Sequence, residues 1–413
     1  MDCMFVTKDG VNATDSTPLA RSDGNASAGI TADDSRLETS DVIADLTRRF
    51  RLCRSIAEEC VQDDEELMRL LHDKSHPVAY DGFEPSGRMH VAQGITKIMN
   101  VNRLVAAGFE VKIWIADWFA QLNGKLDGDL DRIRLCGDYM VEIWRCSGME
   151  EKGVQFLRSS EEIGKRSDEY WTLVMDIARR NTLNRVVRCS QIMGRSEKND
   201  LSAAQIMYPC MQCADVFFLG ADVCQMGMDQ RKVNMLAREY AEESGRRKPV
   251  ILSHHMLPGL QSGQDKMSKS DPKGSVFMDD SAEDVERKIA KAYCPPRVTD
   301  RTNPCVEYVK HLIFPWYGLF QVTEDRSYKS YDQFEKDYAD GNVHPKDLKV
   351  SLARSLNAIL EPVRHHFEHD PIARDLRARF TETLGSSSAY SAADLSQKSD
   401  SSHTTRSPLR RVT

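Results

Sequence analysis

The chain has 413 residues, of which 40% are hydrophobic and 29% are charged, and its mean hydropathy is −0.50. At about 100–200 residues per domain, this length predicts two or three domains with a core that needs no disulfides. No run approaches the roughly 18 apolar residues of a membrane-spanning helix, which excludes a membrane span. The formal net charge of −7 excludes a globally basic nucleic-acid binder but allows a local basic face.

The two ends of the chain have the composition of disordered extensions. Residues 1–38 and 384–413 are rich in Ser, Ala, Thr and Asp, so they bury little apolar surface. The first six residues are too short an apolar run for a signal peptide, and acids such as Asp9 and Asp15 argue against a mitochondrial transit peptide. The 11 cysteines have no framework spacing and indicate a reducing compartment, so we expect a cytoplasmic protein.

Between these ends the apolar pattern predicts two domains. A first helix should begin near Thr39 or Ser40, and a second after the acidic residues that start at Asp63. From Val78 onward the pattern alternates, with strands expected at 78–83, 111–116, 154–157, 221–224 and 249–252, and helices ending at 106 and spanning 129–146, 202–218 and 229–243. This alternation predicts βαβ units, that is, an α/β domain with a parallel sheet and flanking helices at 39–294. Residues 295–383 should form a smaller, mainly helical domain.

A first candidate site lies where the earliest βαβ strand ends. The strand runs into Glu84-Pro85-Ser86-Gly87, and the next helix carries His90 in its first turn. Ligands in parallel sheets bind beyond the carboxyl ends of the strands, and a helix N-terminus offers free N–H groups to a phosphate. His90 would then donate to a phosphate oxygen. The alternative is an ordinary turn with a surface histidine.

A second candidate is the loop Lys266-Met267-Ser268-Lys269-Ser270, which follows the last predicted strand. Lysines among small residues suit a segment that closes on a polyphosphate and stabilises the charge developing there. The alternative is a solvated loop, because a string of five residues is a weak motif by itself.

Two further segments lie between these motifs: Tyr208-Pro209-Cys210-Met211-Gln212-Cys213-Ala214-Asp215 and Gly227-Met228-Asp229-Gln230-Arg231-Lys232. In this order the four segments resemble class I aminoacyl-tRNA synthetases, and closely the tyrosyl-tRNA synthetases of the eukaryotic and archaeal kind. The resemblance covers roughly residues 40–370. It implies a Rossmann-like catalytic domain followed by a smaller helical anticodon-recognition domain.

The reaction implied by this resemblance consumes ATP. L-tyrosine would be activated to tyrosyl-adenylate with release of pyrophosphate, and then transferred to the 3′ end of tRNA(Tyr). The substrate carboxylate attacks the α-phosphorus in line, so catalysis consists of positioning and charge stabilisation. Mg²⁺ is expected on the polyphosphate, held by ATP and water, and no protein metal site is expected.

The family pattern assigns residues to each part of the substrates. The phosphates would face His90, Gln93, Lys266 and Lys269, and ATP would also contact Gly94, Asp229, Met267 and Ser268. Tyr80 and Asp215 would hydrogen-bond the substrate phenol. The other tyrosine contacts would be Glu84, Ala116, Phe119, Tyr208, Gln212 and Gln230. Each of these positions has a purely structural alternative, for example as a half-buried residue of a strand or helix.

One departure from the family pattern concerns the first signature, usually written His-Ile-Gly-His. This chain has His90-Val91-Ala92-Gln93. Gln93 donates a neutral hydrogen bond but carries no positive charge, so part of the charge stabilisation would shift to Lys266 and Lys269.

The resemblance also concerns RNA and assembly. Asp347 lies in the block His344-Pro345-Lys346-Asp347-Leu348-Lys349, which resembles the anticodon-reading segment of the family. A carboxylate accepts hydrogen bonds from guanine, and an aromatic residue should stack nearby. The family forms homodimers, which we also expect here.

Two other functions fit the sequence less well. The sibling tryptophan enzyme shares the fold, but an indole N–H has no use for a pair that both donates and accepts. A non-enzymatic RNA-binding or signalling role is disfavoured by the intact lysine loop. Cys210 and Cys213 lack the second ligand pair of a zinc site and should be core residues. The pairs His254-His255 and His365-His366 lack metal-spaced partners, which predicts surface or packing roles.

Overall fold

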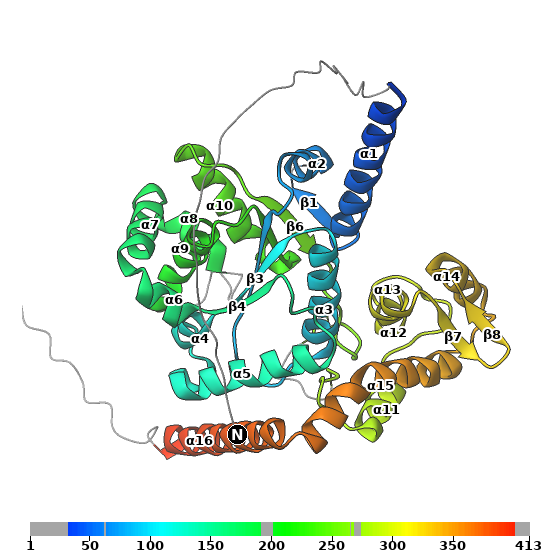
Figure 1. Ribbon diagram of the computed structural model, residues 1–413. Helices are drawn as coiled ribbons and strands as arrows, with labels where there is room; N and C mark the ends of the chain where they lie inside the picture. The colour runs from blue at the N-terminus through cyan, green and yellow to red at the C-terminus, as the bar shows by residue number, and fades with distance from the viewer. Residues whose placement is uncertain (1–31, 62, 191–200, 265, 268–273, 401–413) are drawn as a thin grey trace, which may run out of the picture. The chain divides into compact units, whose positions relative to one another are not determined.

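The computed structural model describes the backbone of residues 32–61, 63–190, 201–264, 266–267 and 274–400 (Figure 1). The chain divides into a unit of residues 1–44 and a unit of residues 45–413. Helix α1 spans Ala32–Arg54, so the predicted start near Thr39 or Ser40 is too late. The residues before Thr39 include Asp33 and Asp34, and acidic residues are favourable in a first helical turn.

A six-stranded sheet forms the centre of residues 45–413, in the order β1-β6-β5-β2-β3-β4. The strands are β1 (Glu59–Val61), β2 (Val78–Phe83), β3 (Glu110–Ile115), β4 (Val154–Arg158), β5 (Val223–Gly227) and β6 (Val250–His254). All neighbouring pairs are parallel except β1 with β6. The five predicted parallel strands are therefore confirmed, whereas the short edge strand β1 was not predicted.

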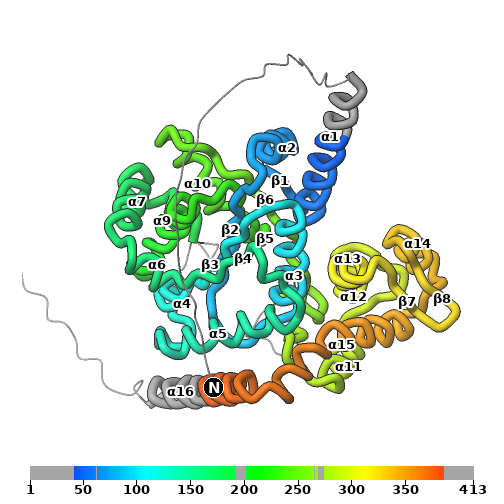
Figure 2. Tube along the Cα trace, viewed as in Figure 1, coloured from blue at the N-terminus to red at the C-terminus, as the bar shows by residue number. Residues whose placement is uncertain are grey.

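Neighbouring residues of a strand point to opposite faces of the sheet and belong to two hydrophobic clusters, one on each face. Val111 and Ile113 of β3 join the first cluster, and Trp114 joins the second; Ala79 and Tyr80 of β2 divide in the same way. Helices α3 (Val91–Ala106) and α5 (Leu130–Cys146) cover the first face (Figures 1 and 2). The second face is covered by α7 (Ser167–Arg180), α8 (Leu183–Cys189), α9 (Ala203–Phe218) and α10 (Arg231–Glu243). Burial on both faces explains the apolar strands, since a parallel sheet is covered on each side.

The remaining helices of this part connect or flank the sheet. They are α2 (Asp64–Asp73), α4 (Asp117–Leu122), α6 (Ser159–Lys165) and α11 (Ala282–Lys291), with 3₁₀ turns at Lys125–Gly128 and Met228–Gln230. Several begin at side-chain caps that the sequence displays. Asp63 caps α2, Asp129 caps α5, and Ser202 forms a capping box with Gln205 at α9.

The C-terminal part is mainly helical, as predicted. It contains α12 (Pro304–Tyr308), a π-helical turn (Val309–Ile313), α13 (Phe314–Tyr317), α14 (Tyr331–Asp340), α15 (Pro345–His369) and α16 (Pro371–Asp400). The hairpin β7 (Phe320–Thr323) with β8 (Arg326–Tyr328) was not predicted. Helix α16 continues beyond Leu384, where the sequence predicted a disordered tail, because extending an existing helix costs far less than starting one. Residues 401–413 lie outside the described residues.

None of the helices in the described part of the chain is long and apolar enough to cross a membrane.

Candidate active site

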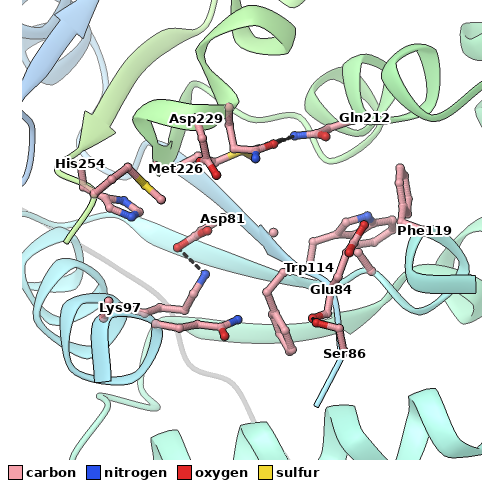
Figure 3. Close-up of a pocket in the computed structure, with 18 of the residues that line it drawn as sticks. Asp81, Glu84, Ser86, Lys97, Trp114, Phe119, Gln212, Met226, Asp229 and His254 are labelled. Atoms are coloured by element: carbon pink, nitrogen blue, oxygen red, sulfur yellow. Dashed lines mark hydrogen bonds and ion pairs between the residues drawn. The ribbon is translucent and has the colours of Figure 1, made fainter. Parts of the chain in front are cut away.

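A cavity of about 780 Å³ opens at the carboxyl ends of β2, β3, β5 and β6 (Figure 3). Strand β2 lies between β3, its successor along the chain, and β5, which follows only after a long excursion through α5 to α9. This reversal of strand order is a topological switch point, where parallel sheets bind ligands. The predicted residues Tyr80, Glu84, His90, Gln93, Ala116, Phe119, Tyr208, Gln212, Asp215, Asp229, Gln230, Lys266 and Met267 all line the cavity.

The enclosed part of the cavity contains a carboxylate between two phenols. Tyr80 donates to Asp215 Oδ2 (3.3 Å), and Tyr170 of α7 donates to Asp215 Oδ1 (2.9 Å). Burial raises the pKa of Asp215 well above its ordinary value, and the phenol hydrogen bonds oppose that rise. Sequence reasoning missed Tyr170, because a single tyrosine in a helix carries no signal for a partner 45 residues away.

Gly82 leaves room for this arrangement. A Cβ atom at position 82 would lie 3.1 Å from the Tyr80 hydroxyl oxygen, because alternate strand residues face the same side. Any larger side chain would press on the Tyr80 ring, so glycine keeps the phenol in place.

Polar groups surround a second region, near the ends of β2 and α9. Tyr208 donates to Glu84 Oε1 (2.7 Å), and Asn123 donates to the same carboxylate (3.1 Å). The Tyr208 ring meets Phe119 edge to face at 5.0 Å. Across from them, Gln212 Nε2 donates to Gln230 Oε1 (3.1 Å). This part of the cavity therefore offers both a carboxylate and amide groups to a polar ligand.

Helix α3 points its N-terminus toward the cavity. His90 is its N-cap, and the His90 Nδ1 accepts from the backbone N–H of Gln93 (3.1 Å). Gly94 does not line the cavity; it lies in the first turn, where a Cβ atom would collide with Met278.

The His90 segment pairs through its backbone with a stretch that follows the lysine loop in the chain. Val91 N–H donates to Val276 O (2.9 Å), and Met278 N–H donates to Met89 O (2.8 Å), so residues 276–278 pair with 89–91. Lys266 reaches Asp229 Oδ2 at 3.5 Å across the cavity. Ser268 and Lys269 lie outside the described residues.

Two further cavity groups were not predicted. Lys97 and Asp81 form an ion pair of 2.6 Å in which both side chains are buried (Figure 3). Burial and the Lys97 ammonium lower the pKa of His254 to about 3, so this ring is neutral at pH 7. Gln225 Nε2 donates to the neutral His254 Nδ1 (2.7 Å), which leaves the Nε2–H as a donor.

The Lys97–Asp81 pair allows a stability prediction. We expect Lys97→Met to lower the free energy of unfolding by about 3 kcal/mol, because it leaves a buried carboxylate without its cation. Combining it with Asp81→Leu should recover most of that loss, since an apolar pair has no charge to desolvate. Urea unfolding measures both. In the exposed Lys165–Glu162 pair, Lys165→Met is the control and should leave the midpoint unchanged; an equal loss there would contradict the burial argument.

The sequence predicts no partners at metal spacing for His255, but the structure places two possible ligands beside it. His255, Glu307 and His311 bring their ligand atoms within 4.8 Å of one another. The His255 ring donates to Glu58 (2.9 Å) and Glu307 (2.7 Å) and stacks on His311 with centroids 4.0 Å apart. Ligands of a tetrahedral zinc ion lie about 3.3 Å apart. The shorter His255–Glu307 separation is that of a direct hydrogen-bonded ion pair.

Asp347 is exposed in the first turn of α15, remote in sequence from the cavity residues, and does not line the cavity. From the aromatic-rich segment before it, Tyr317 is exposed and donates to Ser355 O of the same helix (3.3 Å). Cys210 and Cys213 are both buried in α9, as expected of core cysteines.

Comparison with known proteins agrees with this architecture. The model of the family "tRNA synthetases class I (W and Y)" matches residues 72–361. The cytoplasmic tyrosine–tRNA ligase 1 of Arabidopsis thaliana is 58% identical over 339 residues, which cover 80% of this chain and 88% of that relative.

Solved structures are similar over most of the chain. The tyrosyl-tRNA synthetase of Leishmania major, in complex with tyrosinol, has a TM-score of 0.79 at 46% identity, covering 82% of this chain and 66% of that one. That of Aeropyrum pernix has a TM-score of 0.75 at 36% identity, covering 82% and 99%. The chain belongs to the class I tRNA synthetases and, within them, to the tyrosyl-tRNA synthetase family.

Proposed function

We propose that this chain is a tyrosine–tRNA ligase that forms tyrosyl-adenylate from L-tyrosine and ATP and transfers tyrosine to tRNA(Tyr). The observation that supports this function most directly is the buried Asp215 between the phenols of Tyr80 and Tyr170. A carboxylate in such surroundings needs hydrogen-bond donors, and a third phenol is a ligand that supplies one.

The long Tyr80–Asp215 hydrogen bond suggests how the substrate is read. At 3.3 Å this bond is weak, whereas the Tyr170–Asp215 bond of 2.9 Å is of ordinary length. A bound phenol can donate to Asp215 Oδ2 while the Tyr80 hydroxyl turns to donate to the phenol oxygen. Tryptophan would satisfy only Asp215, because its indole N–H accepts no hydrogen bond. Phenylalanine would satisfy neither group.

The rest of the substrate fits the remaining polar groups of the cavity. Glu84 and the amides of Gln212 and Gln230 would hold the tyrosine ammonium and carboxylate. The N-terminus of α3, with His90 and Gln93, would receive the phosphates of ATP, and Asp229 would accept from the ribose. Lys266 would stabilise the departing pyrophosphate.

Magnesium would enter with ATP. The cavity carboxylates Asp81, Glu84, Asp215 and Asp229 each have a side-chain partner within the described part of the chain. Because these carboxylates already have partners, a Mg²⁺ ion that enters with ATP would be held mainly by phosphate oxygens and water.

For tRNA, Asp347 would accept from the Watson–Crick edge of the first anticodon base. We expect Asp347→Ala to raise the KM for tRNA about tenfold or more, because one base contact is worth about 1–3 kcal/mol. Pyrophosphate exchange, which needs no tRNA, should be unchanged. Steady-state aminoacylation with an Asp340→Ala control measures this; a fall in exchange, or an unchanged KM for tRNA, would contradict the assignment.

We also propose that the protein acts in the cytoplasm and as a homodimer, as the family does. The Arabidopsis relative is named a cytoplasmic enzyme, which supports the first of these proposals. Sedimentation of the full chain tests the second.

The experiment that tests the function is exchange of labelled pyrophosphate into ATP, with tyrosine, tryptophan and phenylalanine compared side by side. We expect exchange with tyrosine only. Exchange with tryptophan would overturn the roles of Tyr80 and Asp215, and the absence of exchange with all three would favour a non-catalytic function.

A further inference from the structure

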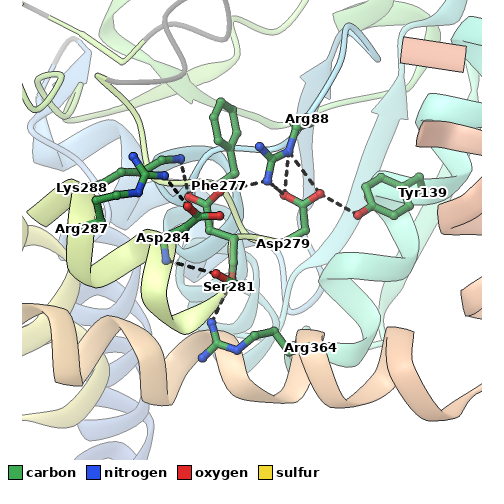
Figure 4. A network of polar contacts seen from close by, with 10 residues as sticks. Arg88, Tyr139, Phe277, Asp279, Ser281, Asp284, Arg287, Lys288 and Arg364 are labelled. Atoms are coloured by element: carbon green, nitrogen blue, oxygen red, sulfur yellow. Dashed lines mark hydrogen bonds and ion pairs between the residues drawn. The ribbon is translucent and has the colours of Figure 1, made fainter. Parts of the chain in front are cut away.

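Outside the cavity, Arg88 joins the turn before His90 to Asp279 and Asp280, which follow the lysine loop in the chain (Figure 4). It lies two residues before His90, and its Nη2 donates to Asp279 Oδ1 (2.6 Å) and Asp280 Oδ1 (3.0 Å). Tyr139 of α5 donates to the other oxygen of Asp279 (2.9 Å). Two successive carboxylates after the lysine signature therefore hold the turn that precedes His90.

Asp280 is the buried centre of this network. Besides Arg88, it accepts from Lys288 Nζ of α11 (2.6 Å) and from the backbone N–H of Phe277 (2.8 Å). The Phe277 ring packs against both cations, with Arg88 at 4.3 Å and Lys288 at 4.7 Å from its centroid. Two cations and two carboxylates thus neutralise one another around the Phe277 ring, and the backbone of Phe277 pairs with that of His90.

Helix α15 reaches the same segment from the C-terminal part of the chain. Arg364 Nη1 donates to the backbone carbonyl of Asp280 (3.0 Å), and its Nη2 donates to Asn357 O (2.7 Å). Asn357 Nδ2 in turn donates to Ala282 O (3.2 Å). One helix face therefore holds the main chain at residues 280 and 282.

These contacts form a continuous path from α15 to His90. Arg364 holds the Asp280 backbone, Asp280 and Arg88 hold the turn, and residues 276–278 pair with 89–91. Asp347 lies on the same helix, about 26 Å from Arg364 at 1.5 Å per residue. The path therefore connects the helix that carries Asp347, which we propose to read tRNA, with the turn that we propose to bind phosphate.

We propose that Arg364, Asp280 and Arg88 are positioning residues for adenylate formation, which tie helix α15 to residues 276–280 and to the turn before His90, and fix the backbone that presents His90 to ATP. The inference rests on the proposed function. Arg88 acts through others, because its guanidinium is occupied by Asp279 and Asp280 and does not line the cavity. A misplacement of a catalytic group by about 1 Å can cost as much as 100-fold in rate.

The test is the pre-steady-state burst of tyrosyl-adenylate on the full chain, without tRNA. Its amplitude counts competent sites, and its rate reports the chemical step. For Arg364→Met we expect the amplitude of the wild type and a rate roughly 10- to 100-fold lower. Arg364→Lys should recover part of the rate, since an ammonium still donates to the Asp280 carbonyl. Arg354→Met, at an exposed arginine of the same helix, is the control.

Other outcomes overturn the inference. A smaller amplitude at an unchanged rate would make Arg364 merely structural, and an unchanged burst would remove its role altogether. If Arg364→Met does not fold, Arg88→Lys replaces it, because an ammonium keeps the charge but cannot hold Asp279 and Asp280 through the two nitrogens that the guanidinium uses. A slower burst at full amplitude is again the expected result, and an unchanged burst overturns the path. A wild-type chain without any burst would instead overturn the proposed function.

Discussion

Asp215→Asn is expected to reduce kcat/KM for tyrosine about 100-fold, or about 2.7 kcal/mol, while the protein remains folded. The substrate phenol would lose its charged acceptor, and an asparagine amide would compete for the Tyr80 and Tyr170 hydroxyls. Discrimination against phenylalanine should fall in parallel, because phenylalanine never used this contact. Tyrosyl-tRNA synthetases as a class reject phenylalanine about 10⁵-fold, a property of the class rather than a result of this geometry.

The measurement is steady-state pyrophosphate exchange with both amino acids, together with a thermal melt. The melting temperature should stay the same or rise, since a buried carboxylate is costly to the folded state. Tyr170→Phe is the matched variant: it removes one donor to Asp215 without touching the substrate acceptor, so a smaller loss is expected. An equal loss for both amino acids in Asp215→Asn would show that Asp215 does not read the phenol.

Lys266→Met is expected to slow adenylate formation about 100- to 1000-fold, the usual cost of removing one group that stabilises developing charge. Its ammonium lies only 3.5 Å from Asp229 and is half exposed, so it can leave that partner for a phosphate. Because Gln93 is neutral, the loss of this cation cannot be offset from the first signature.

Single-turnover formation of tyrosyl-adenylate measures the effect. The KM for tyrosine should remain nearly constant, because Lys266 would act on the departing pyrophosphate and not on the amino acid. Lys152→Met, at an exposed lysine remote in sequence, controls for a general loss of charge. A rise in the KM for tyrosine with an unchanged rate would place Lys266 in amino-acid binding.

Much of the fold could be predicted because its signals are local. The strands that begin at Val78 and Val154 and the helices capped by Asp129 and Ser202 are marked by apolar runs and capping residues that lie next to them in the chain. Strand β1 could not be predicted, because three residues are too few to show a periodic apolar pattern. Its place in the sheet depends on pairing with β6, almost 200 residues later.

The residues of the candidate site also fall into two groups: those with a local sequence signal and those without one. His90, Lys266, Tyr80 and Asp215 were found from segments whose residue order is distinctive, and the structure brings residues of all four segments to one cavity. Tyr170, Lys97 and Asp81 were missed, because a single tyrosine in a helix or an isolated Lys and Asp has no local signature. Each acquires its role from a partner that the chain reaches only after folding.

The sequence by itself determined the parallel α/β class, the family and the place of the turn at His90 that we propose to bind phosphate, since each of these rests on short segments with a physical requirement of their own. Only the tertiary structure decided that Asp215 serves two phenols, that Lys97 is neutralised by Asp81, and that Arg364 holds the backbone behind His90. Hydrogen bonds and ion pairs act over about 3 Å in space, whatever the distance along the chain. Contacts between residues 16 to 135 positions apart therefore leave no pattern in one sequence.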